Sequence, residues 1–255
     1  MRLRILLSLA AILAVPLRAV SPPLLEDALL KVAQDKGRWA YTESDIVRNG
    51  QGKTLNSTVV RFDPSRPYPE QFLPLKIDDR APTRTETEKY RERGVRRGRS
   101  LEKAENAGRP VPGRTLGDLV DLNSAHVFAE DATTVTYEVP LRADNNERFP
   151  PDRFQVLIRV SKAGRSLEHV SVHLRAPMRI ALILKVKSGE IDAEFALVDS
   201  GHNPVMTAIR GDGTLSILFM PVARRGEMIR TDFKHVVPYD ERFNVHIGAA
   251  KALDF

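Results

Sequence analysis

Cysteine is the most informative absence in this 255-residue chain, which contains none. Without thiols the protein cannot form disulfides, thiolate metal sites, a cysteine nucleophile or the lipidated cysteine of a membrane-anchored lipoprotein. Stability must come from hydrophobic packing and backbone hydrogen bonds, and a chain of this size buries roughly 70% of its unfolded surface. With 42% hydrophobic and 28% charged residues, the composition fits one large globular domain or two small ones.

Recognisable catalytic motifs are also missing. Ser200 has no G-x-S-x-G context, and Asp199, Ser200 and His202 stand too close together in one turn to form a catalytic triad. His169 and His173 are four residues apart in an expected strand, a separation of about 13 Å that prevents them from sharing a metal. The sequence therefore predicts no catalytic residue, no metal and no cofactor. An enzyme built from polar residues on distant strands remains an open alternative.

The longest apolar run lies at the N-terminus. Arg2 and Arg4 precede an apolar stretch over 5–17. This stretch is too short to cross a bilayer of about 30 Å as a helix. This pattern predicts a signal peptide over 1–19 that is cleaved near Ala19, and therefore export to the periplasm. An uncleaved N-terminal anchor is the alternative. After cleavage we expect no membrane span.

A capping box marks the start of an expected helix further along the chain. Thr83 is placed to cap the first turn, and Glu86 follows three residues later. The helix is predicted to run from Arg84 to about Arg93, because Gly94 follows and glycine weakens a helix interior. It opens an insertion over 84–113 that is either helical or flexible.

This insertion over 84–113 carries the strongest excess of positive charge in the chain. Arg96, Arg97 and Arg99 are predicted to contact lipid head groups or an acidic envelope protein; the alternative is a solvated, partly disordered segment. Few aromatic residues interleave with these arginines, so nucleic acid is not an expected partner. The overall charge agrees, because cleavage would remove three of 39 basic residues and leave 36 against 33 acidic ones, a net charge of +3.

Most of the remaining chain alternates apolar and polar residues, as strands with one buried face do. An amphipathic helix is expected after Pro22, ending at Gly37, and glycine turns are expected at Gly189, Gly211–Gly213 and Gly226. The predicted strands cover 38–47, 56–63, 72–77, 125–129, 133–141, 154–160, 167–174, 180–186, 191–198, 205–209, 214–221 and 228–237. We therefore predict a mainly β, α+β fold: a single domain over 20–255 with one large antiparallel sheet of about eleven strands, which must curl.

One segment carries a resemblance to known proteins. The runs RFDPSRP at 61–67, FLPLKIDD at 72–79 and APT at 81–83 resemble a segment shared by a group of exported bacterial proteins. The order of elements is similar to that of the periplasmic lipoprotein carriers with the LolA/LolB-like fold. This resemblance implies a half-barrel whose concave side is plugged by the N-terminal helix and the helical insertion, with a hydrophobic cavity between them that receives acyl chains.

A curled sheet covered on one face only by a helix and an insertion has room for a ligand, although a filled core is the alternative. The candidate lining residues are Trp39, Tyr41, Ile180, Leu182, Leu184 and Phe195. The predicted function is a non-catalytic periplasmic binding or carrier protein for a lipid, a lipoprotein acyl chain or another amphipathic ligand. The alternative is an envelope signalling or assembly module that binds a protein partner through the basic insertion.

Overall fold

The computed structural model describes residues 22–35, 37–106, 115–143, 150–181, 184–217 and 220–243. Some predictions fall wholly or partly elsewhere, among them the strands over 180–186 and 214–221, which include the undescribed residues 182–183 and 218–219. The signal segment over 1–19 with its cleavage site near Ala19, the end of the basic insertion over 107–113, and Leu182 all lie outside the described residues.

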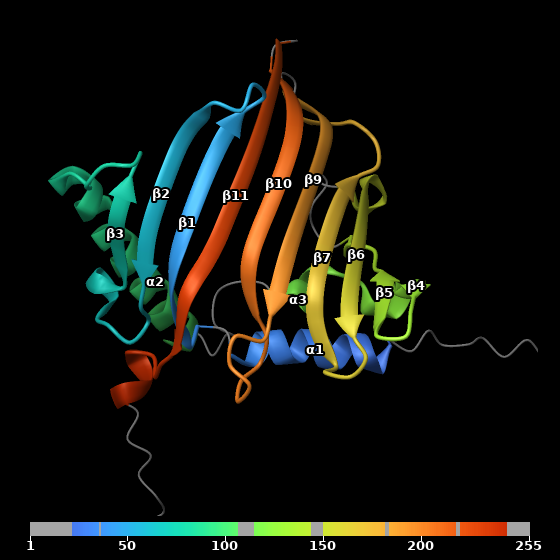
Figure 1. The fold of residues 1–255 in the computed structure, drawn as a ribbon, viewed down its shortest axis with the longest axis horizontal. Helices are drawn as coiled ribbons and strands as arrows, with labels where there is room; N and C mark the ends of the chain where they lie inside the picture. Colours follow the sequence, from blue (N-terminus) through green and yellow to red (C-terminus); the bar gives the residue numbers. More distant parts are fainter. Residues whose placement is uncertain are drawn as a thin grey trace, which may run out of the picture.

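Within the described ranges the chain forms α-helices, short 3₁₀ helices and eleven strands (Figure 1). The helices are α1 Pro23–Gln34, α2 Arg84–Asn106, α3 Leu116–Leu119, η1 Tyr68–Glu70, η2 Leu122–Ser124, η3 Pro151–Arg153 and η4 Asp240–Phe243. The strands are β1 Trp39–Asn49, β2 Thr54–Phe62, β3 Phe72–Ile77, β4 His126–Glu130, β5 Thr134–Glu138, β6 Phe154–Ser161, β7 Ser166–Leu174, β8 Met178–Ala181, β9 Leu184–Ala196, β10 Val205–Ile217 and β11 Met220–His235.

All eleven strands belong to one open antiparallel sheet, which confirms the predicted fold class. The strand order is β3-β2-β1-β11-β10-β9-β7-β6-β5-β4, and β8 pairs with β9 beside this path. Figure 1 shows the long central strands bending along their length. The first and last described strands, β1 and β11, are neighbours, so segments far apart in the sequence lie side by side inside the sheet.

The helices cover one face of the sheet and lie behind it in the view of Figure 1. Helix α1 packs on β6 and β7, where the main core forms, and α2 packs on β3 and η1 at the other end. The core consists of Leu25, Ala28, Leu29, Val120, Val135, Tyr137, Val139, Val156, Ile158, Val160, Leu167 and Val170. Because α1 and α2 lie over opposite ends of the row of strands, neither of them covers the middle of this face.

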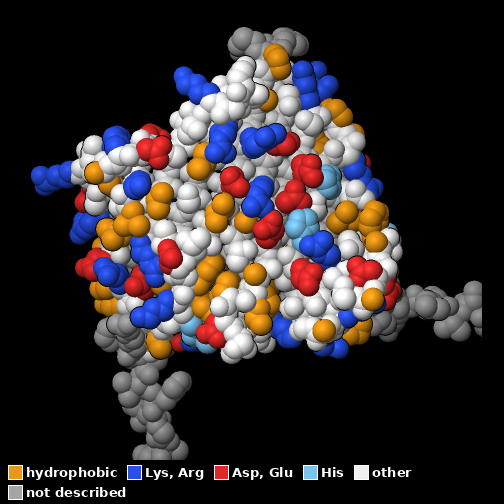
Figure 2. Space-filling view, viewed as in Figure 1, with side chains coloured by type: hydrophobic (Ala, Val, Ile, Leu, Met, Phe, Trp, Pro, Cys, Tyr) orange, Lys and Arg blue, Asp and Glu red, His pale blue; other side chains and the backbone are white. Residues whose placement is uncertain are grey.

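The opposite face of the sheet carries many charged side chains among exposed apolar ones. Figure 2 looks onto it and shows acidic, basic and histidine side chains side by side over the central strands. Arg210 of β10 pairs with Glu194 of β9 and, at 2.9 Å, with Glu227 of β11. His169 lies 3.2 Å from Asp192. One apolar face and one charged face explain why alternating residues identify the strands.

Three predicted turns are wrong, because the glycines concerned lie inside long strands. Gly189 is within β9, Gly211 and Gly213 within β10, and Gly226 within β11. Gly211 pairs with Gly226, and Gly213 pairs with Gly189, so the glycines align across three neighbouring strands. A row of residues without side chains lets a long sheet bend sharply, which is a second use of glycine that local sequence cannot tell from a turn.

The single strand expected over 180–186 is also wrong. Strand β8 ends at Ala181 and β9 begins at Leu184, and these two residues pair in antiparallel register. A continuous apolar run indicates strand structure but contains no residue that marks where one strand ends and the next begins.

Helix α2 was expected to end at about Arg93, before Gly94, and this expectation is wrong. The helix continues to Asn106. Its capping box is confirmed: the Thr83 backbone N–H donates to the Glu86 carboxylate at 2.8 Å, and the Glu86 N–H donates to the Thr83 hydroxyl at 3.3 Å. The glycines serve close packing instead. A Cβ atom on Gly94 would lie 1.8 Å from the Tyr68 carbonyl oxygen, and one on Gly98 would lie 2.6 Å from the Tyr68 ring.

We expect Gly94→Ala to destabilise the protein by about 1 to 3 kcal/mol, measured by urea unfolding. Alanine favours a helix interior over glycine by about 1 kcal/mol, but here the added methyl group would overlap backbone of η1. Gly117→Ala in α3 is the control, because its Cβ would meet only the Thr115 hydroxyl oxygen at 3.7 Å, an ordinary contact. A Gly94→Ala protein as stable as this control would contradict the close packing.

Glu86 gives a second test, through pH. The Arg80 guanidinium and the Thr83 N–H and hydroxyl hold the pKa of Glu86 at about 2, below its ordinary 4.5. Its ionised form therefore stabilises the folded state fully above about pH 4.5, and this stabilisation is lost as the pH falls towards 2. Glu86→Gln should flatten the fall in unfolding free energy across this window, followed by circular dichroism. Glu88→Gln, whose partner is the exposed Arg91, should keep the wild-type profile.

Candidate functional site: a cavity between the sheet and the helices

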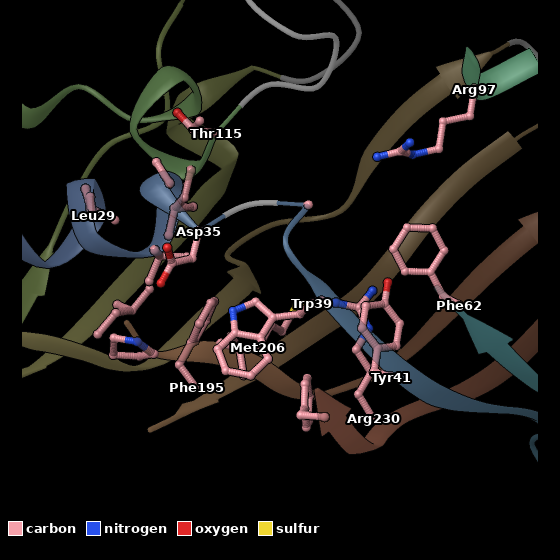
Figure 3. A pocket seen from close by; sticks show the side chains of 18 of the residues that line it. Leu29, Asp35, Trp39, Tyr41, Phe62, Arg97, Thr115, Phe195, Met206 and Arg230 are labelled. Atoms are coloured by element: carbon pink, nitrogen blue, oxygen red, sulfur yellow. The ribbon is translucent and has the colours of Figure 1, made fainter. Parts of the chain in front are cut away.

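A partly open cavity of about 590 Å³ lies between the middle of the sheet and the helices (Figure 3). Small-molecule pockets in proteins typically measure about 300 to 1,000 Å³. The helical side and its connections supply Leu29, Val32, Ala33, Asp35, Gly37, Arg97, Ser100, Leu101, Thr115 and Leu116. The sheet and its loops supply Trp39, Tyr41, Phe62, Leu167, Phe195, Pro204, Val205, Met206, Arg230 and Phe233. The lining is mainly apolar, with a small number of polar groups.

Aromatic rings from three neighbouring strands form one wall of the cavity. Tyr41 lies 5.2 Å from Phe62 and 5.9 Å from Phe233 between ring centroids, and Trp39 lies 6.1 Å from Phe233. Strand pairing produces this arrangement, because β1 lies between β2 and β11. Tilted and edge-on contacts at these separations are favourable for aromatic pairs, so the wall is held in place without a ligand.

Arg230 in the wall is already neutralised. It faces Glu43 across the β1–β11 ladder, with its Nη2 2.9 Å from the carboxylate, and both side chains are about four-fifths buried. Its guanidinium also lies 4.3 Å from the centroid of the Tyr41 ring. Burial raises the pKa of Tyr41 above its ordinary value of 10, an effect that Arg230 opposes, so the phenol is neutral at pH 7.

Arg97 enters the cavity from α2, and its guanidinium extends towards the centre of the cavity in Figure 3. It donates a 3.0 Å hydrogen bond to Oε1 of Gln71 and lies 5.5 Å from the centroid of the Phe62 ring. No carboxylate among the described residues lies within ion-pair distance of it. Burial lowers the pKa of Arg97, but a guanidinium stays protonated in proteins. Within the described ranges, this half-buried charge therefore has no close counterion.

The structure separates the predicted lining residues into two groups. Trp39, Tyr41 and Phe195 line the cavity. The side chains of Ile180 and Leu184, like the whole of Leu182, are outside the described residues. Leu184 starts β9 and Phe195 is eleven positions further along it, a distance of about 35 Å along a strand. The backbone therefore places Leu184 and Phe195 at opposite ends of β9.

The three predicted contact arginines are also separated. Arg97 points into the cavity, whereas Arg96 and Arg99 are exposed on α2, with Arg96 paired to Glu92. Arg93, one turn before Arg97, stacks over the ring of Phe72 at 4.3 Å. The helix thus docks on the aromatic end of the sheet partly through arginines.

Sequence reasoning missed several lining residues. Phe233 and Arg230 fall within the strand predicted over 228–237, although β11 begins earlier, at Met220. Nothing local indicates that β11 pairs with β1. For α2 a usable signal exists: Gly94 and Gly98 are four residues apart and so lie on one helix face, next to Arg97. A strip of small residues on a helix indicates the side on which another segment packs closely.

The other polar candidates are occupied within the fold. The Asp199 carboxylate accepts a hydrogen bond from the Gly201 N–H at 2.9 Å and lies 3.2 Å from Nδ1 of His202. The His202 ring stacks on His235, with centroids 3.9 Å apart. Across the described residues, no group of three or more histidine, aspartate and glutamate side chains is placed to hold a metal ion.

Among the described helices, none has both the length and the apolar character needed to cross a membrane. Comparison of the chain with protein-family models, curated proteins and solved structures finds no match. The cavity, with its apolar walls and few polar groups, has the composition of a ligand-binding site.

The Arg230–Glu43 pair is expected to stabilise the fold more than a surface pair does. In a double-mutant cycle of Arg230→Met and Glu43→Gln, urea unfolding should give a coupling of about 1 to 3 kcal/mol, because the pair is mostly desolvated. The matched control is Arg91 and Glu88, which are more than half exposed and should couple by less than about 0.5 kcal/mol. Equal coupling energies would contradict the buried geometry.

Proposed function

We propose that this protein is an exported binding or carrier protein that holds the apolar part of an amphipathic ligand, such as a lipid or a lipoprotein acyl chain, in its cavity without chemical change. The observation that carries the proposal is the mainly apolar cavity of about 590 Å³ between the sheet and its helices. An acyl chain that leaves water for such a site gains about 0.8 kcal/mol per buried methylene group.

The way in which the sheet is covered supports this role. Helix α1 packs over β6 and β7 and α2 over β3, so the aromatic wall at Trp39, Tyr41 and Phe233 faces a space that no helix fills. Pockets that are lined mainly by apolar and aromatic side chains with a few polar groups are typical binding sites for the apolar part of a ligand. The N-terminal signal pattern and the resemblance to periplasmic lipoprotein carriers add an export route and a need to shield acyl chains in an aqueous compartment.

Trp39 provides a direct assay, because it is the only tryptophan in the chain and it lines the cavity. Ligand binding should therefore change the intrinsic tryptophan fluorescence of the whole protein. Protein purified from periplasm should carry a bound lipid detectable by native mass spectrometry. Absence of any bound lipid, together with no displacement of a fluorescent fatty-acid probe, would remove the proposal.

Ala33→Phe is expected to weaken binding of this probe by about tenfold or more, because the new ring would occupy space on the α1 side of the cavity. Leu30→Phe is the matched control. Leu30 is on the same helix but 59% exposed, so its replacement should leave both probe affinity and stability close to wild type. Similar binding by the two variants would show that the probe binds outside the cavity.

A further inference from the structure

We propose that the head group of the ligand is a carboxylate or phosphate and that it pairs with Arg97 at the α2 end of the cavity. This inference rests on the proposed function, since it requires an amphipathic ligand in the same cavity. It specifies the charge of the ligand and the direction in which the ligand lies.

The two cavity arginines differ in their partners. Arg230 has its carboxylate partner, Glu43, at 2.9 Å. Within the described residues, Arg97 has the neutral amide oxygen of Gln71 and the ring of Phe62 as neighbours. Asp240 attracts it electrostatically without forming an ion pair in that part of the chain. A guanidinium taken partly out of water without a close counterion costs free energy, and an anionic ligand would offset that cost.

Arg97 is held in position by Gln71. Gln71 is 1% exposed, and its Nε2 donates to the carbonyl oxygens of Pro64 at 3.3 Å and Arg66 at 3.0 Å. These bonds fix the Gln71 amide so that Oε1 faces Arg97. A guanidinium held by a buried side chain loses less conformational freedom on binding than a mobile surface arginine does.

A third, independent observation comes from Trp39 on the facing wall. This side chain is 5% exposed, and its Nε1–H has no hydrogen-bond partner in the described part of the chain. A buried indole donor normally has an acceptor. Trp39 lies between Arg97 and Phe195 in Figure 3, and its ring contacts those of His202 and His235 edge-on. A ligand with acceptor oxygens therefore suits the cavity, whereas the position of the head group follows from Arg97.

The polar groups also give the ligand a direction. Figure 3 shows Arg97 at one end of the cavity and Leu29 and Phe195 towards the other. Asp35 lies near Leu29 and accepts a hydrogen bond from the Asn203 N–H at 3.0 Å. Its negative charge disfavours an anion at that end. The head group therefore lies towards α2 and the apolar chain towards α1.

The test compares three ligands with the same twelve-carbon chain: laurate, dodecyl phosphate and neutral dodecanol. Affinities are measured from Trp39 fluorescence and by calorimetry on the whole mature protein. We expect the wild type to bind at least one anionic ligand about 10- to 100-fold more tightly than dodecanol, as for hydrogen bonds to a charged group. The two anionic ligands distinguish a carboxylate head from a phosphate head.

Arg97→Gln should remove most of this preference, and Arg97→Lys, which keeps the charge but not the planar fork, should retain part of it. Arg96→Gln removes the same charge from an exposed position on the same helix and should retain the full preference. Circular dichroism and urea unfolding confirm that each variant is folded.

The outcomes separate the two proposals. If dodecanol binds as tightly as both anions, or if Arg97→Gln weakens all three ligands equally, the head-group assignment is overturned while the binding function stands. If Arg96→Gln removes the preference as fully as Arg97→Gln, the anion interacts with the general charge of α2 and the assignment to Arg97 is overturned. If none of the three binds and no lipid copurifies, both proposals fail.

Discussion

The pairing of β1 with β11 is the interaction on which the rest of the structure depends. It joins residues near the start of the described chain to residues near its end, with Trp39 opposite His235 and Glu43 opposite Arg230. Without this ladder, β1 to β3 would be a separate small sheet, and the aromatic wall would lack Phe233. Closing so long a loop costs only slightly more entropy than closing a short one, so the ladder and the aromatic contacts can offset it. Such distant pairing is, however, expected to slow folding.

Coverage of the sheet is the second constraint. An eleven-stranded sheet is wider than its helices can cover, and the structure places one long helix at each end rather than both in the middle. At the α1 end the contact is aliphatic and close-packed. At the α2 end it depends on glycines against η1 and on arginines stacked over aromatic rings. The cavity is the space that remains between the two packed helices and the sheet.

The two cavity arginines show how the same residue type can serve stability or binding. Arg230 is paired with Glu43 across a ladder, so its charge is compensated within the fold. Arg97 is fixed by Gln71 but has no close acid among the described residues, so the free protein retains an unfavourable charge at that point. Residues that reduce stability in this way are concentrated at functional sites, because a binding partner compensates them.

Local patterns made the fold class predictable. The capping box at Thr83 and Glu86, the alternation in β5 to β7 and the apolar face of α1 each depend on residues within a few positions of one another. The same locality explains the errors. Gly94 has the sequence context of a helix end and Gly211 that of a turn, yet both lie inside regular elements because distant backbone packs against them or pairs with them.

The sequence by itself determined that the chain forms strands with one apolar face, a helix at each of two positions and a basic second helix. It also identified Trp39, Tyr41 and Phe195 as apolar residues suited to a cavity wall. Only the tertiary structure decided that β11 lies beside β1, that Arg97 turns inward while Arg96 and Arg99 stay in water, and that a cavity remains between the helices. The physical reason is that strand order and helix docking depend on contacts between residues far apart in the chain, which local periodicity does not encode.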